Sequence, residues 1–371
     1  MFINYYRMKI KEILFALENL APVSLQEEYD NAGLTIGQAD EETQGCLICI
    51  DVNESVIDEA IRKNCSLIIS HHPVIFKGLK RLTGQTMTER IVAKAIREDI
   101  AICSMHTNLD NVMEGVNRIL SRQLGLGNLS ILRKTNGQLR KLVTFCPVDF
   151  SVQVRDAMFN AGAGHSGEYD QCSFNAEGIG SFRAGEKANP FVGEVGEIHF
   201  EKEVRIETIF PFYRQNNIIR ALLESHPYEE VAYDIYTLDN ESDQTGAGMI
   251  GELEQKITEV EFLQKLKDIL KVPCIRHSPL LGKMVGTVAV CGGSGSFLLQ
   301  DAIQQKADFF VSADIRYHQF FDADGKIVIA DAGHYESEQF TCNLLADYLK
   351  EKFANFAVQI SETPVNPVNY F

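Results

Sequence analysis

Short apolar runs alternate with amphipathic segments through the first third of the chain. Residues 46–51 form an apolar run that predicts a buried strand, and residues 66–70 predict a second one. Between them, residues 55–64 have apolar positions at helical spacing. A helix at 88–98 and a strand at 100–104 continue the alternation. This order predicts a parallel or mixed sheet with helices packed on it, and therefore an α/β fold.

The same order of elements returns near the C-terminus. Residues 46–72 and 288–314 align without gaps, strand on strand and helix on helix, although few positions are identical. In each half a further strand then runs into a histidine, at His106 and at His334. We expect duplicated α/β halves that together form one domain. The alternative is that two unrelated strand–helix units agree by chance.

The segment between the halves has a different order of elements. The predicted elements are a strand at 142–146, a helix at 151–161, strands at 171–179 and 204–210, a helix at 216–225 and a strand at 231–237. This βαββαβ order is typical of a ferredoxin-like domain. We therefore expect the first half of the α/β domain at 1–133, an inserted ferredoxin-like α+β domain at 134–245 and the second half at 246–371.

Composition narrows the class of protein. The 371 residues carry a formal charge of -16, which argues against binding to nucleic acid or to an anionic membrane. The nine cysteines are odd in number and lie mostly in apolar runs, which fits reduced thiols better than a disulfide framework. No run approaches the roughly 18 apolar residues of a membrane helix. We expect a cytoplasmic protein.

The N-terminal segment does not have the pattern of a signal peptide. Residues 1–21 combine charged side chains with spaced apolar ones and predict an amphipathic helix. Met1 and Met8 are both possible natural starts, and residues 1–7 would be an extension in the second case.

Two adjacent histidines follow the predicted strand at 66–70. Adjacent strand residues point to opposite faces of a sheet, so His71 and His72 can meet at one centre only where the backbone leaves strand geometry. Pro73 suits such an exit, because it lacks an N–H donor and restricts the residue before it. The alternative is one core histidine and one surface histidine.

Two further histidines each precede a carboxylate by four residues: His106 precedes Asp110, and His334 precedes Glu338. Residues four apart share one helix face, so each pair can offer an imidazole and a carboxylate to one point. With the adjacent pair, these donors exceed the needs of one tetrahedral ion. They suit two divalent ions that activate water, and nitrogen and oxygen donors favour Zn, Fe or Mn. The alternative is that they are unrelated polar residues at strand ends.

Three weaker features accompany this set. The Gly-rich loop at 291–296 could present backbone N–H groups to an anion, or could be a plain tight turn. Asp314 aligns with the position of the histidine pair, and could line the same cleft or be a surface aspartate. His318 could be a proton-transfer group or could have no functional role.

Several sequence blocks resemble signatures of the NIF-three-like family, whose members are also called GTP cyclohydrolase I type 2 homologs. The blocks are YDNAGL at 29–34, SHHPVIF at 70–76, HTNLD at 106–110 and GHYESE at 333–338. The similarity extends from about Met8 to Phe371. GHSGEYDQCSF at 164–174 and HPYEE at 226–230 resemble the PII/CutA-like insert of the longer, YqfO-type bacterial members.

The resemblance implies a centre of two divalent metal ions in each subunit. The residues that match its ligands are His71, His72, Asp110, His334 and Glu338. His106 matches a histidine beside the centre whose status as a ligand is open. The resemblance also implies a ring-shaped homohexamer whose inserts cover its ends.

Two classes of function are compatible with these features. The first is a metal-dependent hydrolase of the cyclohydrolase, amidohydrolase or phosphoesterase type, in which His106 or His318 moves protons. The second is a non-catalytic metal-binding or regulatory protein that senses a small molecule through its PII-like insert. Processing of nucleic acid is a third reading, which the acidic charge disfavours.

Overall fold

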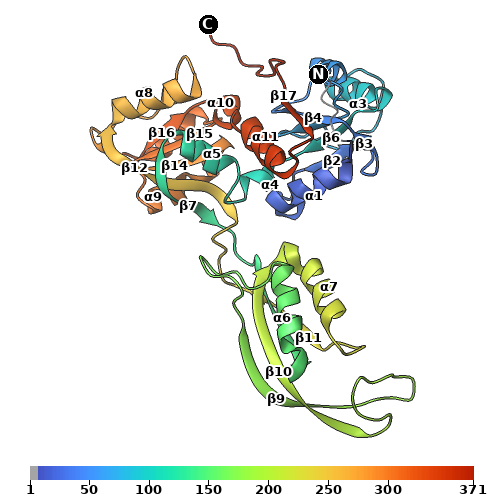
Figure 1. The fold of residues 1–371 in the computed structure, drawn as a ribbon. Coiled ribbons are helices and arrows are strands. Elements are labelled where there is room, and N and C mark those ends of the chain that lie inside the picture. Colours follow the sequence, from blue (N-terminus) through green and yellow to red (C-terminus); the bar gives the residue numbers. More distant parts are fainter. Residues whose placement is uncertain (1–6) are drawn as a thin grey trace. The chain divides into compact units, whose positions relative to one another are not determined.

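The chain forms two compact units (Figure 1). The structure, a computed structural model, describes residues 7–371. The first unit contains the chain up to Arg133 together with Gln244–Phe371, and the inserted unit is Lys134–Asp243. The choice between Met1 and Met8 as the natural start falls on residues 1–6, which lie outside the described residues.

The first sheet of the first unit has the order β17-β4-β5-β6-β2. Its strands are β2 (Gly33–Ile36), β4 (Gly45–Cys49), β5 (Leu67–Ser70), β6 (Ala101–Ser104) and β17 (Ala357–Ile360). All neighbours are parallel except β2, which is antiparallel to β6. The short strand β1 (Met8–Lys9) pairs with β3 (Glu42–Thr43) beside it.

Helices pack on this sheet because their apolar sides and the apolar side chains of the strands form a common core. On one face, α2 (Glu54–Arg62) and α3 (Met87–Arg97) share a core with β4, β5 and β6. Their N-caps, Asn53 and Thr86, each accept a backbone N–H of the first turn, which fixes where the helices begin. The helices α1 (Ile10–Leu20) and α11 (Thr341–Lys352) contact each other, and α11 packs against β4 and β17.

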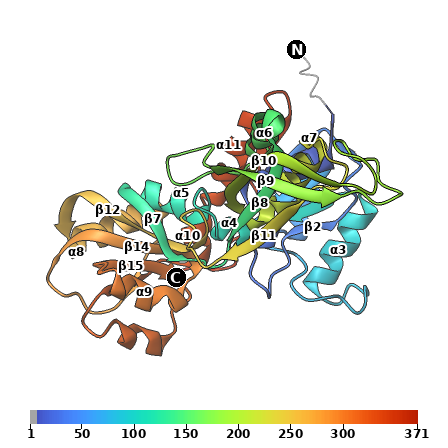
Figure 2. The same cartoon turned by 90° about the horizontal axis from the view of Figure 1, so that it is seen from below.

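The second sheet of the first unit has the order β13-β16-β15-β14-β12-β7. Its strands are β7 (Leu126–Lys134), β12 (Gly246–Thr258), β13 (Arg276–His277), β14 (Met284–Ser294), β15 (Phe309–Ala313) and β16 (Val328–Asp331). One face packs on α5 (Val116–Gln123) and α8 (Glu259–Leu270), and the other on α9 (Leu299–Gln304) (Figure 2).

The two halves of the first unit contain the same local arrangement. In one, β4, β5 and β6 are parallel neighbours, and in the other β14, β15 and β16 are. The histidine-bearing segments follow the carboxyl ends of these strands, where α4 (Thr107–Asp110) and α10 (His334–Glu338) begin. The predicted α/β class, with a mixed sheet in each half, is confirmed.

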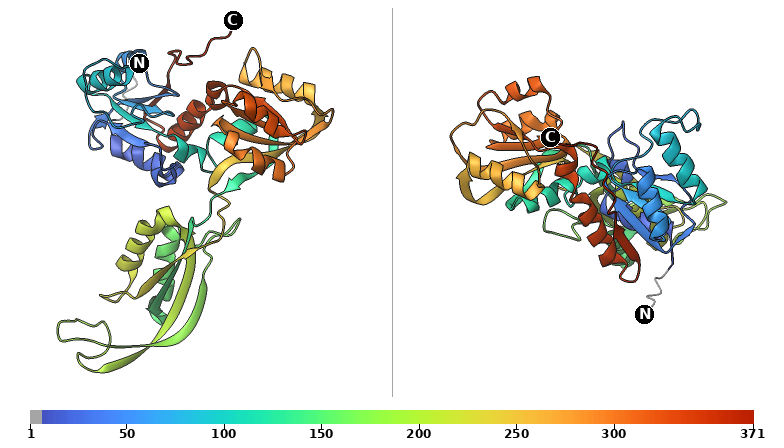
Figure 3. Two further views of the ribbon diagram at one scale, coloured as in Figure 1. Left: turned by 180° about the vertical axis from the view of Figure 1, so that it is seen from behind. Right: turned by 90° about the horizontal axis from the view of Figure 1, so that it is seen from above.

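The inserted unit is a four-stranded antiparallel sheet with two helices on one face (Figure 3, left). Its elements are β8 (Leu139–Pro147), α6 (Ser151–Asn160), β9 (Phe174–Arg183), β10 (Ile198–Pro211), α7 (Gln215–Ser225) and β11 (Tyr233–Leu238). The strand order is β11-β8-β10-β9. The hairpin of β9 and β10 is longer than predicted, because its outer part has few buried positions and so lacks a clear apolar alternation.

Short 3-10 turns complete the secondary structure: Val23–Leu25, Val148–Phe150, Phe212–Arg214, Ser296–Leu298 and Tyr317–Ala323. All nine cysteines are free thiols. Within residues 7–371, no helix has the length and apolar character needed to cross a membrane.

Candidate metal centre

The adjacent histidines lie where β5 ends. Their backbone N–H groups still follow β4, since His71 donates to the Cys49 carbonyl at 3.0 Å and His72 to that of Ile50 at 2.9 Å. The chain then bends, and the Ser70 hydroxyl donates to the His72 carbonyl at 2.8 Å. The two imidazole centres are 4.9 Å apart. Both rings can therefore reach one centre.

Donor atoms from both halves of the first unit converge at this point. The carboxylate of Glu338 lies between three imidazoles, with Nε2 of His72 at 3.1 Å, of His334 at 3.2 Å and of His71 at 3.6 Å. His71 Nε2 also lies 3.8 Å from Asp110 Oδ1. The structure thus brings together all five residues that the sequence matched to metal ligands, and their role as ligands stays a prediction.

The imidazoles of His71, His72 and His334 are each held by a hydrogen bond at Nδ1, the ring nitrogen that faces away from Glu338. The Nδ1 atoms of His72 and His334 are 2.9 Å and 2.7 Å from the carboxylates of Asp51 and Asp314. His71 Nδ1 is 2.7 Å from the Met105 carbonyl, which can only accept, so this nitrogen carries the proton. Anchoring of this kind fixes the tautomer and aims Nε2 at a metal ion.

Within residues 7–371, no hydrogen bond of good geometry reaches three buried polar atoms at the centre, although imidazoles lie close to Glu338: His71 Nε2, Asp110 Oδ1 and Glu338 Oε2. Leaving such an atom unpaired costs about 1–3 kcal/mol. A divalent cation would satisfy all three, because it takes the place of a proton on His71 Nε2 and accepts the lone pairs of all three atoms. His71, His72 and Glu338 alone offer atoms within 4.8 Å of one another, which is compatible with binding of a metal ion.

The protonation of the cluster follows from these contacts. Burial alone would raise the pKa of Glu338, but the charge of His71 and the closeness of the other imidazoles outweigh it and hold this pKa well below its usual range. The Glu338 carboxylate, 3.2 Å away, raises the pKa of His334 to about 9. For His72, burial is outweighed by Asp51 and Glu338, and the pKa rises to about 10. Burial raises the pKa of Asp110 to about 6.

His106 lies beside the cluster and has its own carboxylate partner. Its ring centre is 5.5 Å from that of His71 and 5.4 Å from that of His72. Its Nδ1 is 2.8 Å from Asp30 Oδ1. Burial alone would raise the pKa of Asp30, but the hydrogen bonds from His106 and Thr107 lower it to about 2.

The two motifs with a histidine four residues before a carboxylate are not equivalent in the structure. His334 and Glu338 lie one turn apart in α10 and meet directly. His106 is instead the N-cap of α4 and pairs with Asp30, while Asp110 faces His71. Only the second motif has the geometry that helical spacing predicts.

His318 lies in an exposed turn. Its ring packs against Tyr317 and Phe321, at centre distances of 5.1 Å and 6.4 Å. None of the contacts recorded for it in residues 7–371 joins it to the imidazole cluster. Its role in proton transfer stays a prediction that no contact supports.

The Gly-rich loop at 291–296 makes room for Glu338. A Cβ atom on Gly293 would lie 2.2 Å from Glu338 Oε1. The loop's N–H groups are used within the fold, since Gly293 donates to Ser337 Oγ and Gly295 to Ser312 Oγ, each at 2.9 Å. These groups are therefore not free for an anion.

Sequence reasoning missed Asp30 and Asp51 and gave Asp314 only a weak role. All three are carboxylates bound to an imidazole of the cluster. Asp51 is the last residue of the predicted strand at 46–51, and Asp314 follows β15, so an acidic residue at a strand's carboxyl end was the available signal. Asp30 had no such signal, because it lies in an irregular turn.

A cleft of about 420 Å³ opens beside the cluster. His72 and His334 form one side with their partners Asp51 and Asp314. The remaining walls come from β13, β16 and the C-terminal segment 366–370. The cleft gives a small molecule access to the imidazoles.

Comparison with known proteins places the chain in a family. The family model Duf34/NIF3 (NGG1p interacting factor 3) matches residues 8–367. The chain belongs to this family. The resemblance predicted from the sequence is thereby confirmed.

Relatives within the family match along nearly their whole length. A protein of Bacillus subtilis (strain 168) named "GTP cyclohydrolase 1 type 2 homolog" is 39% identical over 365 residues, which cover 97% of this chain and 98% of that protein. A protein of the same name from Halalkalibacterium halodurans is 39% identical over 364 residues, covering 96% and 98%. The crystal structure of a Bacillus cereus protein related to NIF3 matches with a TM-score of 0.86 and 37% identity, covering 98% of this chain and 99% of that one.

Proposed function

We propose that this protein is a hydrolase that depends on two divalent metal ions held by His71, His72, Asp110, His334 and Glu338. One observation carries the proposal: imidazoles anchored at Nδ1 surround a buried carboxylate, and in the described part of the chain no hydrogen bond of good geometry reaches three of the central atoms. A purely structural cluster would leave these atoms unpaired at a cost in stability. Zn, Fe and Mn all suit this donor set.

The chain's own residues have separate tasks in this proposal. Cations at such a site act as Lewis acids and lower the pKa of bound water. Asp51 and Asp314 orient the imidazoles of His72 and His334. His106, held at Nδ1 by Asp30, takes or gives a proton at Nε2. The relatives' name, with its reference to GTP cyclohydrolase, suggests a nitrogen-containing ring as the substrate, and phosphoesters are the next class to test.

The test compares metal content with turnover. His72→Ala and Glu338→Ala should lose the metal, measured by plasma mass spectrometry, and any hydrolysis found in a screen of phosphoesters and cyclic amides. His165→Ala, at an exposed histidine of the inserted unit, is the matched control and should retain both. Activity that survives complete loss of metal would refute the proposal.

A regulatory function without catalysis is the second candidate. The inserted unit contains a cavity of about 660 Å³ with aromatic walls, which favours recognition of a small molecule away from the cluster. In that case the metal-loaded protein would turn over no substrate while a ligand of the insert changes its metal affinity. Titration of metal with and without that ligand distinguishes the two candidates.

We also propose that the protein assembles as a homohexamer. Light scattering should then give the mass of six copies of the 41.6 kDa chain, and a smaller mass would contradict the proposal.

We further propose that the insert is a ferredoxin-like, PII/CutA-like domain and that the first unit consists of duplicated halves. The order β11-β8-β10-β9, with two helices on one face, supports the first assignment. The repeated order of β4-β5-β6 and β14-β15-β16 supports duplicated halves.

A further inference from the structure

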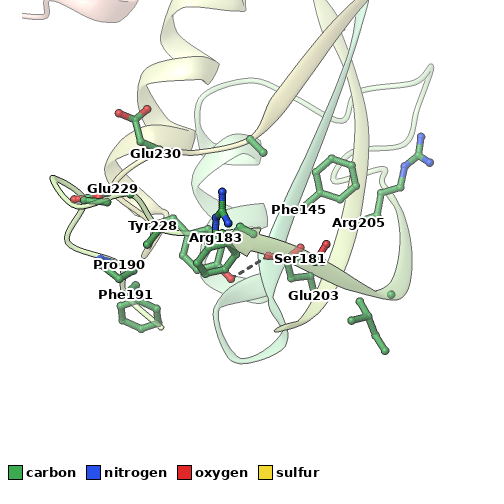
Figure 4. Close-up of a pocket in the computed structure, with 18 of the residues that line it drawn as sticks. Phe145, Ser181, Arg183, Pro190, Phe191, Glu203, Arg205, Tyr228, Glu229 and Glu230 are labelled. Atoms are coloured by element: carbon green, nitrogen blue, oxygen red, sulfur yellow. Dashed lines mark hydrogen bonds between the residues drawn. The ribbon is translucent and has the colours of Figure 1, made fainter. Parts of the chain in front are cut away.

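The inserted unit has a cavity that the proposed hydrolase does not use. It lies on the face of the sheet opposite the helices, since Glu203 and Arg205 of β10 alternate with the core residues Val204 and Ile206. Its volume is about 660 Å³, within the range of small-molecule sites. Figure 4 shows residues from β8, β9, β10 and the turn after α7 around it.

Two glycines of β9 lie on the floor of the cavity, one under the Glu203 carboxylate and one uncovered. A Cβ atom on Gly180 would lie 2.1 Å from Glu203 Oε2, so the carboxylate rests directly on this strand. A Cβ atom on Gly178 would meet nothing within 4 Å. A flat ring can therefore lie on this part of the sheet next to the carboxylate.

Aromatic side chains form the walls of the cavity. The ring centre of Tyr228 is 6.1 Å from that of Phe182 and 6.3 Å from that of Phe191. The connection that carries Phe191 is held to the opposite turn, because the Asn189 N–H donates to Glu229 Oε1 at 2.9 Å. Aromatic faces at these positions favour a planar ligand.

The polar groups of the cavity are set in place by the fold. The Tyr228 N–H donates to His226 Nδ1 at 3.1 Å, and His226 Nε2 then donates to the Phe145 carbonyl at 2.9 Å. So positioned, Tyr228 donates its hydroxyl to Glu203 Oε1 at 2.9 Å, as Figure 4 shows. Burial and the Glu203 carboxylate raise the pKa of Tyr228, which keeps it a donor.

Glu203 and Arg183 are two charged side chains of the cavity with which a ligand can pair. The carboxylates of Glu177, Glu229 and Glu230 also line it. Glu203 forms no ion pair within residues 7–371, and its Oε2 is not engaged by Tyr228. Arg183 also lines the cavity, and its side chain has no recorded hydrogen bond or ion pair in the described part of the chain. A lipid-like ligand would leave both charges unpaired, and a small oxyanion would leave the aromatic walls unused.

We propose that this cavity binds a planar nitrogen heterocycle that carries an N–H donor and an anionic substituent. The ring lies on Gly178, beside the Glu203 carboxylate and between the aromatic side chains. Its N–H donates to Glu203, and the anion pairs with Arg183. This site is independent of the metal cluster and of the proposed hydrolase.

The experiment titrates the full-length protein with AMP and GMP by calorimetry. One site per chain is expected. N6,N6-dimethyl-AMP lacks the N–H donor of AMP, and adenosine lacks the phosphate, so each should bind about tenfold more weakly than AMP. Failure of both AMP and GMP to bind at millimolar concentration, or equal binding of AMP and its dimethyl analogue, would overturn the proposal.

Variants locate the binding in the cavity. Glu203→Gln should weaken AMP binding about tenfold, while Glu201→Gln, two residues earlier on the same face of β10 and outside the cavity, should not. His72→Ala should bind AMP as the wild type does, which excludes phosphate bound at the metal cluster. Equal binding by both β10 variants would overturn the proposal, and the comparison of probes on the wild type decides the case if Glu203→Gln does not fold.

Discussion

At the scale of single residues, the cluster is ordered before any cation arrives. His71, His72 and His334 each commit Nδ1 to a fixed acceptor, so their Nε2 atoms point inward without help from a ligand. Cation binding then costs little side-chain entropy, because the rings have already lost their rotameric freedom. In the described residues, three buried atoms of the cluster also accept no hydrogen bond of good geometry, and each lowers the stability of the metal-free fold.

Metal binding at this cluster should release protons at pH 7. The pKa of His72 rises from 6.5 to about 10 in the metal-free protein, so its charged interactions stabilise the fold fully below about pH 6.5 and are lost as pH rises through about 10. A cation needs the neutral imidazole, so its affinity should increase with pH over this range. Calorimetry at pH 7 in buffers of different ionisation enthalpy measures the release, and its absence would contradict the assigned protonation.

Replacement of Gly293 by alanine should expel the metal. The new Cβ would lie 2.2 Å from Glu338 Oε1 and would displace the carboxylate that three imidazoles share. Gly325→Ala is the matched control, because Gly325 has a φ of +64° against +60° for Gly293 and open space around its Cβ. Both variants should lose about 1 kcal/mol to backbone strain, and only Gly293→Ala should bind metal at least about tenfold more weakly. Equal metal content in the two would show that the loop does not support Glu338.

At the scale of elements, the sequence predicts the helices that bury one face and the strands that are buried on both faces. Clear apolar periods mark the strands β4, β5 and β6 and the helices between them, and the helices begin at N-caps. These elements begin and end within two residues of their predicted positions. The outer part of β9 and β10 has few buried positions, so no pattern marks it. The partners Asp30 and His106 are 76 residues apart, and no local period reports such a contact.

One carboxylate of α2 ties the C-terminal segment to the first sheet. Glu59 is buried and accepts hydrogen bonds from Ser361, Glu362 and Thr363. Glu59→Ala should lower the free energy of unfolding by about 3 kcal/mol, since several donors lose their buried acceptor. Urea unfolding of the metal-free protein measures this, with Glu98→Ala at the exposed end of α3 as the control. Equal stability of the two variants would mean that the segment is held by other contacts.

At the scale of the whole molecule, the cluster joins parts of the chain that are far apart in sequence. His72 and His334 are 262 residues apart and meet at 3.3 Å. Neither half can supply the full set of donors, so the site exists only when both halves of the first unit are folded together. Metal binding therefore adds to the stability of that unit as a whole.

The inserted unit, by contrast, contributes no residue to the cluster, and its removal should leave metal binding intact. The strands that lead into and out of it, β7 and β12, lie in one sheet as neighbours, and Lys134 Nζ is 2.5 Å from Asp243 Oδ1. A linker of about four Gly and Ser residues can therefore replace residues 135–242. The shortened protein should contain as much metal per chain as the full-length protein and should no longer bind AMP.

The same deletion with His72→Ala separates specific from adventitious metal. It should contain no metal, because it lacks a ligand that the deletion alone preserves. If the deletion folds with an unchanged circular dichroism spectrum for the first unit yet contains no metal, the inserted unit must contribute to the site through the assembly of several chains. Metal binding by the shortened protein would instead assign the cluster to one chain's two halves, which is the outcome that the distances among His71, His72 and Glu338 predict.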